Sequence, residues 1–439
     1  MKNKMMKAMA LAMTAAMLFG AFTVSAGEVE VPDEAEELVA EEGAEIEFAY
    51  WEGSSAEEAA WEAVLDQFEA DHPEIKLKPQ TYTSADFRDM LDTRIAGNDW
   101  PDVIRYSYQR LGKFKAADVM LDLTPYVSKA DYDDFADGFI AGCSYDGKIV
   151  ALPHHTDVLA TFYNKQMFEE QGFRIPESID DAYSWEEIAD MGRQLKEAYD
   201  LPYGIAGIWE NNSGYRFLPF IYMNGGALLS YDQTEITMDT DAVREALDWY
   251  ADLRSDDTMI NTGFTAPMVA NNVFAAQQCG IDFAGSWHMS TMEENMPGNW
   301  GVTYMPQRDG KTGNDMGGNG IFCYAGTKYP KASAILASYI TSAEGMKLFC
   351  ETGNFIPVRE SIMGSLDYAN YADEMKLFNE MAATIDPKMA ADETSVGFLQ
   401  LNNVFNEEMD YLVVDGSSTV DDVIANCQER MSEELADLG

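Results

Sequence analysis

The stretch that decides the fold is IEFAYWEGSSAEEAAWEAVLDQFEADHPEIKLKPQ, which spans residues 46–80. Alternate residues from Ile46 to Tyr50 are apolar, and this two-residue period is that of a β-strand. Ser55 and Glu58 then have the spacing of a capping box, which predicts the start of a helix. One face of this helix is apolar at helical spacing and consists of Trp61, Val64, Leu65 and Phe68.

The same alternation of strand and helix continues along the chain. A second strand is predicted at Ile75–Leu77, a second helix that stops at Gly97, and a third strand at Val103–Ile104. This order predicts a mostly parallel sheet with helices on its faces. Strands and helices keep alternating after residue 150, so a second α/β domain is expected. One of its strands leads into a polar loop, through Trp209, Glu210 and Asn211.

Ligands in sheets of this kind bind beyond the carboxyl ends of the strands. Two of those ends are the segments 51–53 (WEG) and 105–110 (RYSYQR). Each offers an aromatic face beside polar groups, and neither contains a nucleophile–base pair. This combination suits a sugar, although Trp51 and Tyr106 would look the same in the sequence if both were core residues.

Length, composition and charge limit the class of protein. A chain of 439 residues exceeds the usual size of one domain, so two domains are expected. Apolar residues make up 46% of the chain and aromatic residues 12%, which is enough for sizeable cores. The net charge of −47 argues strongly against nucleic acid as a partner, because phosphate contacts need clustered Lys and Arg. It also argues against docking on anionic lipid.

The first 45 residues differ from the rest in composition. Three lysines precede an apolar run over residues 8–24, and small residues follow, so residues 1–26 read as a signal peptide cut after Ala26. Residues 27–45 are rich in Glu and Ala and predict a disordered or loosely helical acidic linker. No cysteine follows the apolar run, so a lipid anchor has no attachment residue. We therefore expect an exported protein, in the periplasm or at the extracellular face of the cytoplasmic membrane.

No metal or cofactor site is predicted. The cysteines are odd in number, widely spaced and without a Cys-x-x-Cys pair, so we expect buried free thiols, with one disulfide as the alternative. His154 and His155 are adjacent and would point in opposite directions in a strand, so they do not form a two-ligand metal site. No Gly-x-Ser-x-Gly, His-Glu-x-x-His or Walker-type loop occurs.

A series of motifs after residue 45 resembles the extracellular solute-binding proteins of ABC transporters, in the carbohydrate-binding group that includes maltose-binding protein. These motifs stand in family order and include YWEG at 50, FEADHPEIKL at 68, IAGNDWPDVI at 95, DGKIVALP at 146, NGGALLSYD at 224, FAGSWHMS at 283 and WGVTYMPQRDGK at 300. The chain departs from many Gram-positive relatives because it has no lipobox cysteine.

The resemblance implies a two-lobed periplasmic-binding-protein fold (type II), in which each lobe is a mostly parallel sheet flanked by helices and a hinge joins the lobes. The hinge crossings would lie near His154–Thr156, Gly317–Asn319 and Ile356–Val358. Lobe 1 would comprise residues 46–155 and 319–356, and lobe 2 would comprise residues 156–318 and 357–439. A ligand would lie in the cleft between the lobes and be enclosed by hinge motion.

The resemblance also implies sugar contacts at particular positions. Tyr106 matches a stacking aromatic, Asp157 an acidic contact and Trp287 the main aromatic platform. With the loop residues noted above, the candidate ligand contacts are Trp51, Tyr106, Gln109, Arg110, Asp157, Trp209, Glu210, Asn211, Tyr215 and Trp287. The implied partners are a small-molecule carbohydrate and a transmembrane permease, for a monomer that uses no cofactor and binds no nucleic acid.

Two other classes of function stay open at this point. A secreted glycoside hydrolase or lyase would also combine aromatic residues with carboxylates, and a hydrolase needs two carboxyl groups at a fixed spacing. A binding protein for a non-sugar solute, such as a polyamine or a peptide, would share the fold. We favour a sugar-binding protein that is not an enzyme, because the implied contacts mix aromatic rings with Asp, Asn, Gln and Arg.

Overall fold

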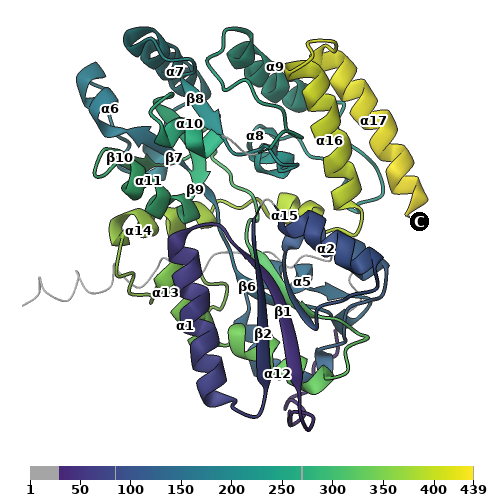
Figure 1. Cartoon of the computed structure of the whole chain (residues 1–439). Helices are drawn as coiled ribbons and strands as arrows, with labels where there is room; N and C mark the ends of the chain where they lie inside the picture. Colours follow the sequence, from purple (N-terminus) through teal and green to yellow (C-terminus); the bar gives the residue numbers. More distant parts are fainter. Residues whose placement is uncertain (1–28, 85, 268–269, 439) are drawn as a thin grey trace, which may run out of the picture.

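The computed structural model describes residues 29–84, 86–267 and 270–438. The chain forms two α/β lobes, one above the other in Figure 1, and each lobe has its own sheet. The first lobe contains β1 (Glu45–Glu52), α1 (Ser55–Asp71), β2 (Lys76–Thr83), α2 (Phe87–Ala96), β3 (Val103–Ser107), α3 (Gly112–Ala116), α4 (Lys129–Asp134), α5 (Asp137–Gly142), β4 (Ser144–Tyr145), β5 (Lys148–Ile149), β6 (Leu152–His155), β11 (Asn319–Cys323), α12 (Pro330–Ile340) and α13 (Ala343–Gly353).

The remaining elements form the second lobe and its junction with the first. They are β7 (Leu159–Asn164), α6 (Lys165–Gln171), α7 (Trp185–Tyr199), β8 (Ile205–Gly207), α8 (Leu218–Met223), α9 (Asp241–Ser255), α10 (Ala270–Ala275), β9 (Ile281–Gly285), α11 (Met289–Asn295), β10 (Trp300–Thr303), α14 (Ala372–Ala382), α15 (Pro387–Glu393), α16 (Phe398–Val413) and α17 (Val420–Asp437). Two short 3-10 turns, Tyr108–Arg110 and Gly214–Arg216, lie in the loops after β3 and β8.

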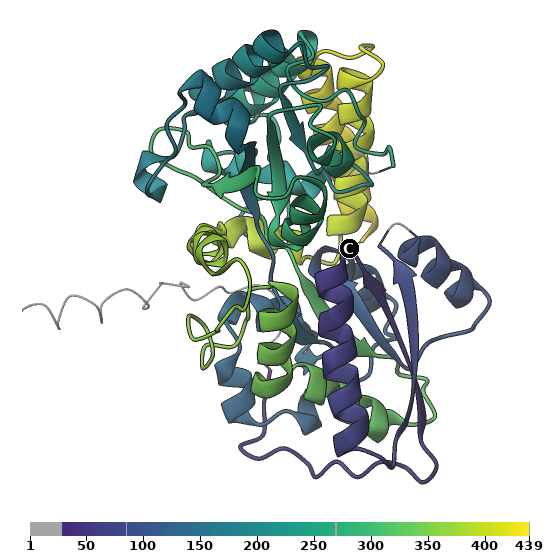
Figure 2. The same cartoon turned by 60° about the vertical axis from the view of Figure 1, so that its left-hand side comes forward.

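The first sheet has the strand order β2-β1-β3-β11-β6. β1 pairs in parallel with both β2 and β3, as the strand–helix alternation of the sequence predicts. The apolar face of α1 packs into the lobe, where Trp61 is fully buried, and α1 lies beside α13 (Figure 2). This arrangement places the carboxyl ends of β1 and β3 at the boundary with the second lobe.

The second sheet has the strand order β10-β7-β9-β8. β8 and β9 are parallel, whereas β7 is antiparallel to both of its neighbours. In the first sheet, β11 is likewise antiparallel to β3 and β6. The sheets are therefore more mixed than the predicted mostly parallel ones. The chain enters each lobe from the junction through β7 or β11. These strands therefore begin at the junction, whereas their antiparallel neighbours end there.

Helix α1 begins one residue before the predicted capping box. The Ser54 side chain accepts a hydrogen bond from the Glu57 N–H at 3.3 Å, so Ser54 is the N-cap in place of Ser55. Ser55 instead donates its hydroxyl to Glu294 in the other lobe at 2.8 Å. The Glu57 carboxylate accepts the Gly53 N–H at 2.7 Å, which fastens the end of β1 to the start of α1.

Residues 29–45 are bonded along the first lobe, so the prediction of a disordered or loosely helical linker is wrong for them. Glu36 donates its backbone N–H to Pro125 O at 2.8 Å. The Glu41 carboxylate accepts two backbone N–H groups near the start of α12, at 2.9 and 3.0 Å. These partners are distant in sequence, so composition alone could not reveal them. Apolar side chains of the segment also pack on the core, namely Val29, Val31, Leu38 and Ala40. The predicted signal peptide lies outside the described residues.

Two of the chain crossings between the lobes lie side by side. The first leads from β6 into β7, and the second leads from the loop before Asn319 into β11. The Thr156 hydroxyl joins them by donating to Gly317 O at 3.0 Å. A third segment touches the same place, because Thr156 and Ile356 exchange backbone hydrogen bonds of 2.9 and 3.2 Å.

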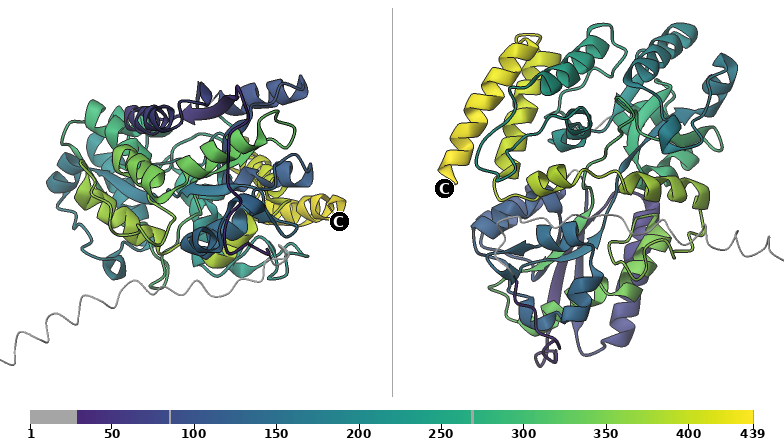
Figure 3. Two further views of the ribbon diagram at one scale, coloured as in Figure 1. Left: turned by 90° about the horizontal axis from the view of Figure 1, so that it is seen from below. Right: turned by 180° about the vertical axis from the view of Figure 1, so that it is seen from behind.

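The third segment stays in the first lobe for longer than the resemblance implies. Beyond Ile356, Val358 O accepts the Ala136 N–H at 3.0 Å, and Arg359 forms an ion pair with Asp134 at 2.9 Å. The Tyr368 hydroxyl still donates to Phe355 O at 2.8 Å. The chain next forms α14, which packs on β7 and β10 of the second lobe. Figures 1 and 3 show α14 and α15 at the junction of the lobes.

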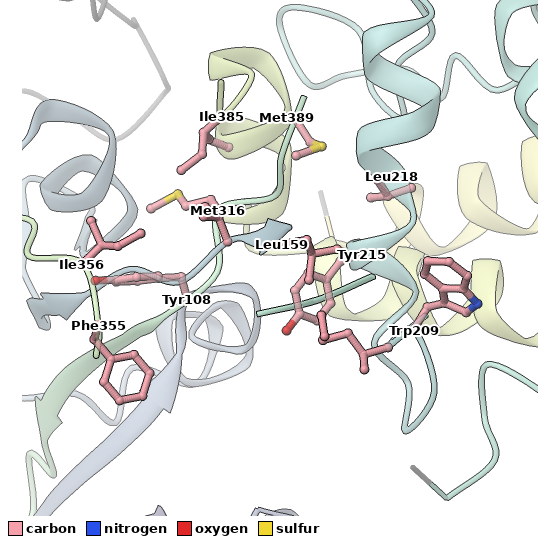
Figure 4. Packing of buried hydrophobic residues seen from close by; sticks show 14 of the residues in the cluster. Tyr108, Leu159, Trp209, Tyr215, Leu218, Met316, Phe355, Ile356, Ile385 and Met389 are labelled. Atoms are coloured by element: carbon pink, nitrogen blue, oxygen red, sulfur yellow. The ribbon is translucent and has the colours of Figure 1, made fainter. Parts of the chain in front are cut away.

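Buried apolar side chains form a continuous cluster across this junction. Figure 4 shows Tyr108 and Ile356 on the side of the first lobe and Leu218 and Trp209 on the side of the second. Met316 lies between them in the same view. The lobes are thus joined by packing as well as by the chain itself, and this joint positions the two sets of strand ends that face each other.

All the cysteines are buried and free, which confirms the predicted thiols. His154 and His155 are fully buried, and burial lowers the pKa of both well below the usual value. Within residues 29–84, 86–267 and 270–438, no group of His, Cys, Asp and Glu is arranged to hold a metal ion. In that same part of the chain, every helix is too short or too polar to cross a membrane.

Candidate functional site

A cavity of about 170 Å³ lies between the lobes. This volume is many times what one water needs and is similar to that of cavities that hold a small organic molecule. Strand ends and loops of both lobes line it, together with the crossing segments. The first lobe contributes Trp51, Gly53, Glu57, Ser84, Phe87, Arg88, Arg105, Tyr106, Ser107 and Arg110, and the remainder is Asp157, Ile208, Asn211, Ser213, Tyr215, Arg216, Trp287, His288, Gly318, Asn319 and Phe355.

The structure brings most of the predicted site residues to this cavity. They reach it from the ends of β1, β3 and β9, from the loop after β8 and from the first crossing. Those that line the cavity are Trp51, Tyr106, Arg110, Asp157, Asn211, Tyr215 and Trp287. Tyr106 is only 2% exposed, so little of its ring is open to a ligand.

Three predicted site residues lie elsewhere, each for a physical reason. Gln109 is turned inward and donates to Met316 O at 2.6 Å and to Glu393 at 3.3 Å, so it holds the junction. Trp209 is fully buried among aromatic rings and donates its indole N–H to the Tyr250 hydroxyl at 3.0 Å. Glu210 is also fully buried, and its carboxylate accepts the N–H of Ala270 at 3.0 Å.

Trp51 is held by a buried arginine of its own sheet. The Arg105 guanidinium lies 4.0 Å from the centre of the Trp51 ring and donates to Trp51 O at 2.8 Å. Glu57 neutralises this arginine in an ion pair of 2.6 Å, with both side chains almost fully buried. Cation–π contact of this kind fixes the ring against rotation. One face of the indole is thus occupied by arginine, and the tryptophan meets the cavity in a set orientation.

Trp287 is held in the same way by the second lobe. The Arg216 guanidinium lies 4.5 Å from the Trp287 ring centre and 5.1 Å from that of Tyr215. It forms ion pairs of 2.9 Å with both Asp157 and Asp315. Burial alone would lower the pKa of Arg216, but Tyr215 and the two carboxylates raise it above the usual value. The predicted ligand contact Asp157 therefore already has a strong partner.

A glycine makes room for each of two tryptophans on neighbouring strands. β9 ends in Gly285-Ser286-Trp287 and β8 in Gly207-Ile208-Trp209. A Cβ atom on Gly285 would come within 1.8 Å of the Trp287 ring, and one on Gly207 within 2.2 Å of the Trp209 ring. Both rings fold back over their strand ends, yet only Trp287 lines the cavity. Trp209 was predicted because a polar loop follows it, and Trp287 because it matches the aromatic platform that the resemblance implies.

Two arginines of the first lobe reach across the cavity to the loop after β8. Arg88 donates through Nη2 to Asn211 O at 2.8 Å and also to the Asn211 side chain. Arg110 donates through Nη2 to Asn212 O at 3.2 Å. Asn211 and Asn212 both have left-handed backbone angles, with φ of 58° and 57°, which turn their carbonyls toward the arginines.

The lobes therefore touch on more than one side of the cavity, since Ser55 of α1 also donates to Glu294 of α11. Such an arrangement is the closed one expected of a hinged two-lobed protein. The wall also has unused polar groups. Neither ring nitrogen of buried His288 has a hydrogen-bond partner within the described chain, and burial, with Arg216 nearby, lowers the pKa of His288 to about 3.

Several residues of the wall were not predicted from the sequence, namely Glu57, Arg88, Arg105, Arg216 and His288. Arg105 directly precedes the predicted Tyr106, and Arg216 directly follows the predicted Tyr215. Their positions beside predicted site residues could have identified them. Arg88 had no such signal because it lies on the side of α2, a helix identified only by its apolar residues.

A family model described as bacterial extracellular solute-binding protein matches residues 63–376. The chain belongs to this family. Two of its curated relatives are an arabinooligosaccharide-binding protein of Bacillus subtilis, 24% identical over 73% of this chain and 75% of the relative, and a multiple sugar-binding protein of Streptococcus mutans, 23% identical over 69% and 73%.

Solved structures of other solute-binding proteins share the fold. The GacH receptor of Streptomyces glaucescens, known unliganded and with acarbose, superposes with a TM-score of 0.77 at 23% identity, over 90% of this chain and 100% of the other. An ABC substrate-binding protein of Listeria monocytogenes in complex with cycloalternan gives 0.77 at 21% identity, over 90% and 99%. Maltose-bound MalE3 of T. maritima gives 0.74 at 19% identity, over 90% and 100%. The two-lobed periplasmic-binding-protein fold predicted from the sequence is thereby confirmed.

Proposed function

We propose that this solute-binding protein is the extracytoplasmic component of an ABC sugar importer, which captures a mono- or oligosaccharide between its lobes and delivers it to a permease by hinge closure. The observation that carries the proposal is the pairing of two fixed tryptophans, Trp51 and Trp287, from opposite lobes in one cavity. The sugar ligands named for the two curated relatives support it.

The chemistry of the wall suits a pyranose or furanose ring. The C–H face of a sugar packs on an aromatic face, and each buried hydroxyl needs a partner, since an unpaired one costs roughly 1–3 kcal/mol. Tyr215, Asn211 and His288 offer such partners beside the rings. Asp157 can accept from hydroxyls with the lone pairs that Arg216 leaves free.

We infer that the protein binds its ligand without changing it. The carboxylates in the cavity wall are Glu57 and Asp157, and each is tied to a buried arginine. A glycosidase needs two carboxyl groups that can act on the scissile bond, and both carboxylates of this wall are already engaged by arginines. An oligosaccharide that binds should be recovered intact after prolonged incubation. Shortened or unsaturated products that vanish in a Glu57→Gln or Asp157→Asn variant would instead support an enzyme.

The cellular side of the proposal comes from the sequence. We propose that residues 1–26 are removed on export, that the mature chain works as a monomer without a lipid anchor, and that surfaces of both lobes meet the permease. Nucleic acid is not proposed as a partner because the net charge is −47. The lobes would comprise residues 46–155 with 319–368, and 156–318 with 369–439, the last boundary being moved to follow the contacts of Tyr368.

A thermal-shift screen tests the proposal directly. Residues 27–439 would be melted with a panel of neutral and acidic mono- and oligosaccharides, and with spermidine and a tripeptide as non-sugar solutes. A ligand at 100 times its Kd stabilises the folded state by about 2.7 kcal/mol, which shifts the melting midpoint measurably. A shift with saccharides alone supports sugar capture, and a shift with only spermidine or the tripeptide would replace it.

A further inference from the structure

Two positive charges in the cavity wall have no carboxylate partner. In the part of the chain that the structure describes, only Arg88, Arg110 and Arg254 among the arginines lack an ion pair. Arg254 lies outside the cavity wall, and its two Nη atoms donate to the oxygens of four other residues. Arg88 and Arg110 both line the cavity, in a chain that has acidic side chains in large excess.

Both guanidinium groups have unused donors. Arg88 and Arg110 each use Nη2 alone, and their acceptors are the neutral Asn211 and the carbonyl of Asn212. The remaining N–H groups make no hydrogen bond to any described residue. Because an arginine fork matches a carboxylate with two parallel hydrogen bonds, these groups are suited to an anion.

The two arginines also disfavour each other. Burial in the first place and the neighbouring Arg110 in the second lower the pKa of Arg88 to about 10. Like charges held together in a half-buried wall are destabilising unless an opposite charge joins them. A negative group in the cavity would remove this repulsion.

The other charged groups of the wall do not cancel the charge of Arg88 and Arg110. Arg105 is neutralised by Glu57, and Arg216 faces both Asp157 and Asp315. Four arginines thus face the two carboxylates of the wall and Asp315, whose pKa burial raises to about 7, so positive charge is in excess. An anion reduces this excess, whereas a polyamine would add to it.

We propose that the ligand is an acidic saccharide with one carboxylate, such as a uronic acid residue at one end, and that Arg88 and Arg110 bind this carboxylate. The inference rests on the proposed function and names the substrate class of the same cavity. The aromatic rings and polar groups near Trp287 then hold the neutral part of the saccharide, and the arginine pair selects for the charge.

The two arginines could instead act only as a clasp on the loop after β8, and the experiment separates these roles. Isothermal titration would compare pairs that differ in one charge, galacturonate with galactose, galacturonate with its methyl ester, and glucuronate with glucose, at two salt concentrations. Arg88→Gln and Arg110→Gln keep a hydrogen-bonding side chain of similar length. The matched control is Arg244→Gln, on the surface of α9, where the arginine pairs with Asp421.

We expect at least one uronate to bind more tightly than its neutral counterpart, and each cavity variant to weaken that uronate by about 10–100-fold, the range for hydrogen bonds to a charged group. Neutral sugars should lose less affinity than the uronate in both cavity variants, and Arg244→Gln should match the natural protein for both kinds of sugar. Melting curves without ligand would establish that each variant is folded.

Four outcomes would overturn the proposal. Equal affinity for neutral and acidic sugars would refute it and leave sugar capture intact. Equal weakening of both kinds of sugar by Arg88→Gln and Arg110→Gln would assign the arginines to lobe closure alone. Preference for galactose 1-phosphate over every uronate would replace the carboxylate by a phosphate. If no saccharide binds at all, the proposed function itself fails together with this inference.

Discussion

Single residues decide which tryptophan serves the cavity and which serves the core. Trp209 and Trp287 both stand two residues after a strand-end glycine, and both rings fold over that glycine. The difference lies in what surrounds them: Trp209 donates to Tyr250 inside the second lobe, whereas Trp287 lies on Arg216 at the cavity. The sequence could not separate the two tryptophans, because the residues around each ring come from other strands and helices.

This pair allows a matched test of the cavity. Trp287→Ala should weaken saccharide binding by roughly 2–4 kcal/mol, as at interface hot spots, which is thirty- to a thousand-fold. Its effect on the melting midpoint should be small because the ring is only partly buried. Trp209→Ala should do the opposite, with a loss of about 3–5 kcal/mol of stability and an unchanged Kd in the folded fraction. Titration and melting on the same preparations would check both. An unchanged Kd for Trp287→Ala would remove it from the site.

A buried carboxyl group predicts a pH dependence of stability. Asp282 lies in β9 with neither carboxylate oxygen hydrogen-bonded within the described chain, and burial first, then Glu210, raise its pKa to about 8. The unfolded group titrates near about 3.9. The folded state thus keeps a proton that the unfolded state has lost, so this stabilisation is complete below the unfolded pKa and disappears as the pH rises through about 8.

Asp282→Asn replaces the protonated acid by a neutral group of the same shape. We expect the melting midpoint of the natural protein to fall between pH 5 and pH 9 by more than that of the variant, and the variant to be the more stable of the two at pH 9. Asp66→Asn, on the exposed side of α1, is the control. Parallel pH profiles for all three proteins would show that Asp282 is ionised throughout.

At the scale of elements, the periodicity of the sequence predicted helix α1, its buried face and its strand neighbours. It missed the cap by one residue because both Ser54 and Ser55 suit the role, and the choice depends on Gly53 and Arg105, which bind Glu57. The acidic segment was the larger error. Its composition is that of a disordered linker, but the Glu41 carboxylate binds the N-terminus of α12 and several of its apolar side chains pack on the core.

The contact of Glu41 with α12 can be measured. Carboxylates that accept backbone N–H groups at a helix start stabilise it by about 0.5–2 kcal/mol. Glu41→Gln should therefore lower the free energy of unfolding by roughly 1 kcal/mol in urea denaturation. Glu37→Gln, four residues earlier on an exposed side chain, should be neutral. Equal stability of the two variants would mean that the acidic segment contributes nothing to the lobe.

At the scale of the whole molecule, the motifs in family order predicted the two lobes. They did not predict that the third segment stays in the first lobe beyond Ile356. Nor did they predict the contacts between lobes, because Arg88, Ser55 and Glu294 have no pattern in common and meet only once the lobes are folded and facing. These contacts are few and partly exposed, so they are worth little by themselves. We expect a saccharide to be needed to hold the closed form.

Spin labels on opposite lobes would test this. Cysteines introduced at the exposed residues Glu62 of α1 and Asn295 of α11 can be labelled selectively, since the natural thiols are buried. The distance between the labels should shorten when a binding saccharide is added. Labels at Glu62 and Glu69, both on α1, should give one unchanged distance. An identical short distance with and without saccharide would show that the empty protein is already closed.

The arginines stacked behind Trp51 and Trp287 have a thermodynamic consequence. Each indole loses its rotational freedom when the lobe folds, because a guanidinium held by buried carboxylates covers one face. A ligand then meets rings whose conformational entropy is already reduced, and its binding does not have to order them. Calorimetry should accordingly give a less unfavourable binding entropy for this protein than for an Arg105→Met or Arg216→Met variant. In such a variant the indole is free to rotate, so ligand binding would have to order it.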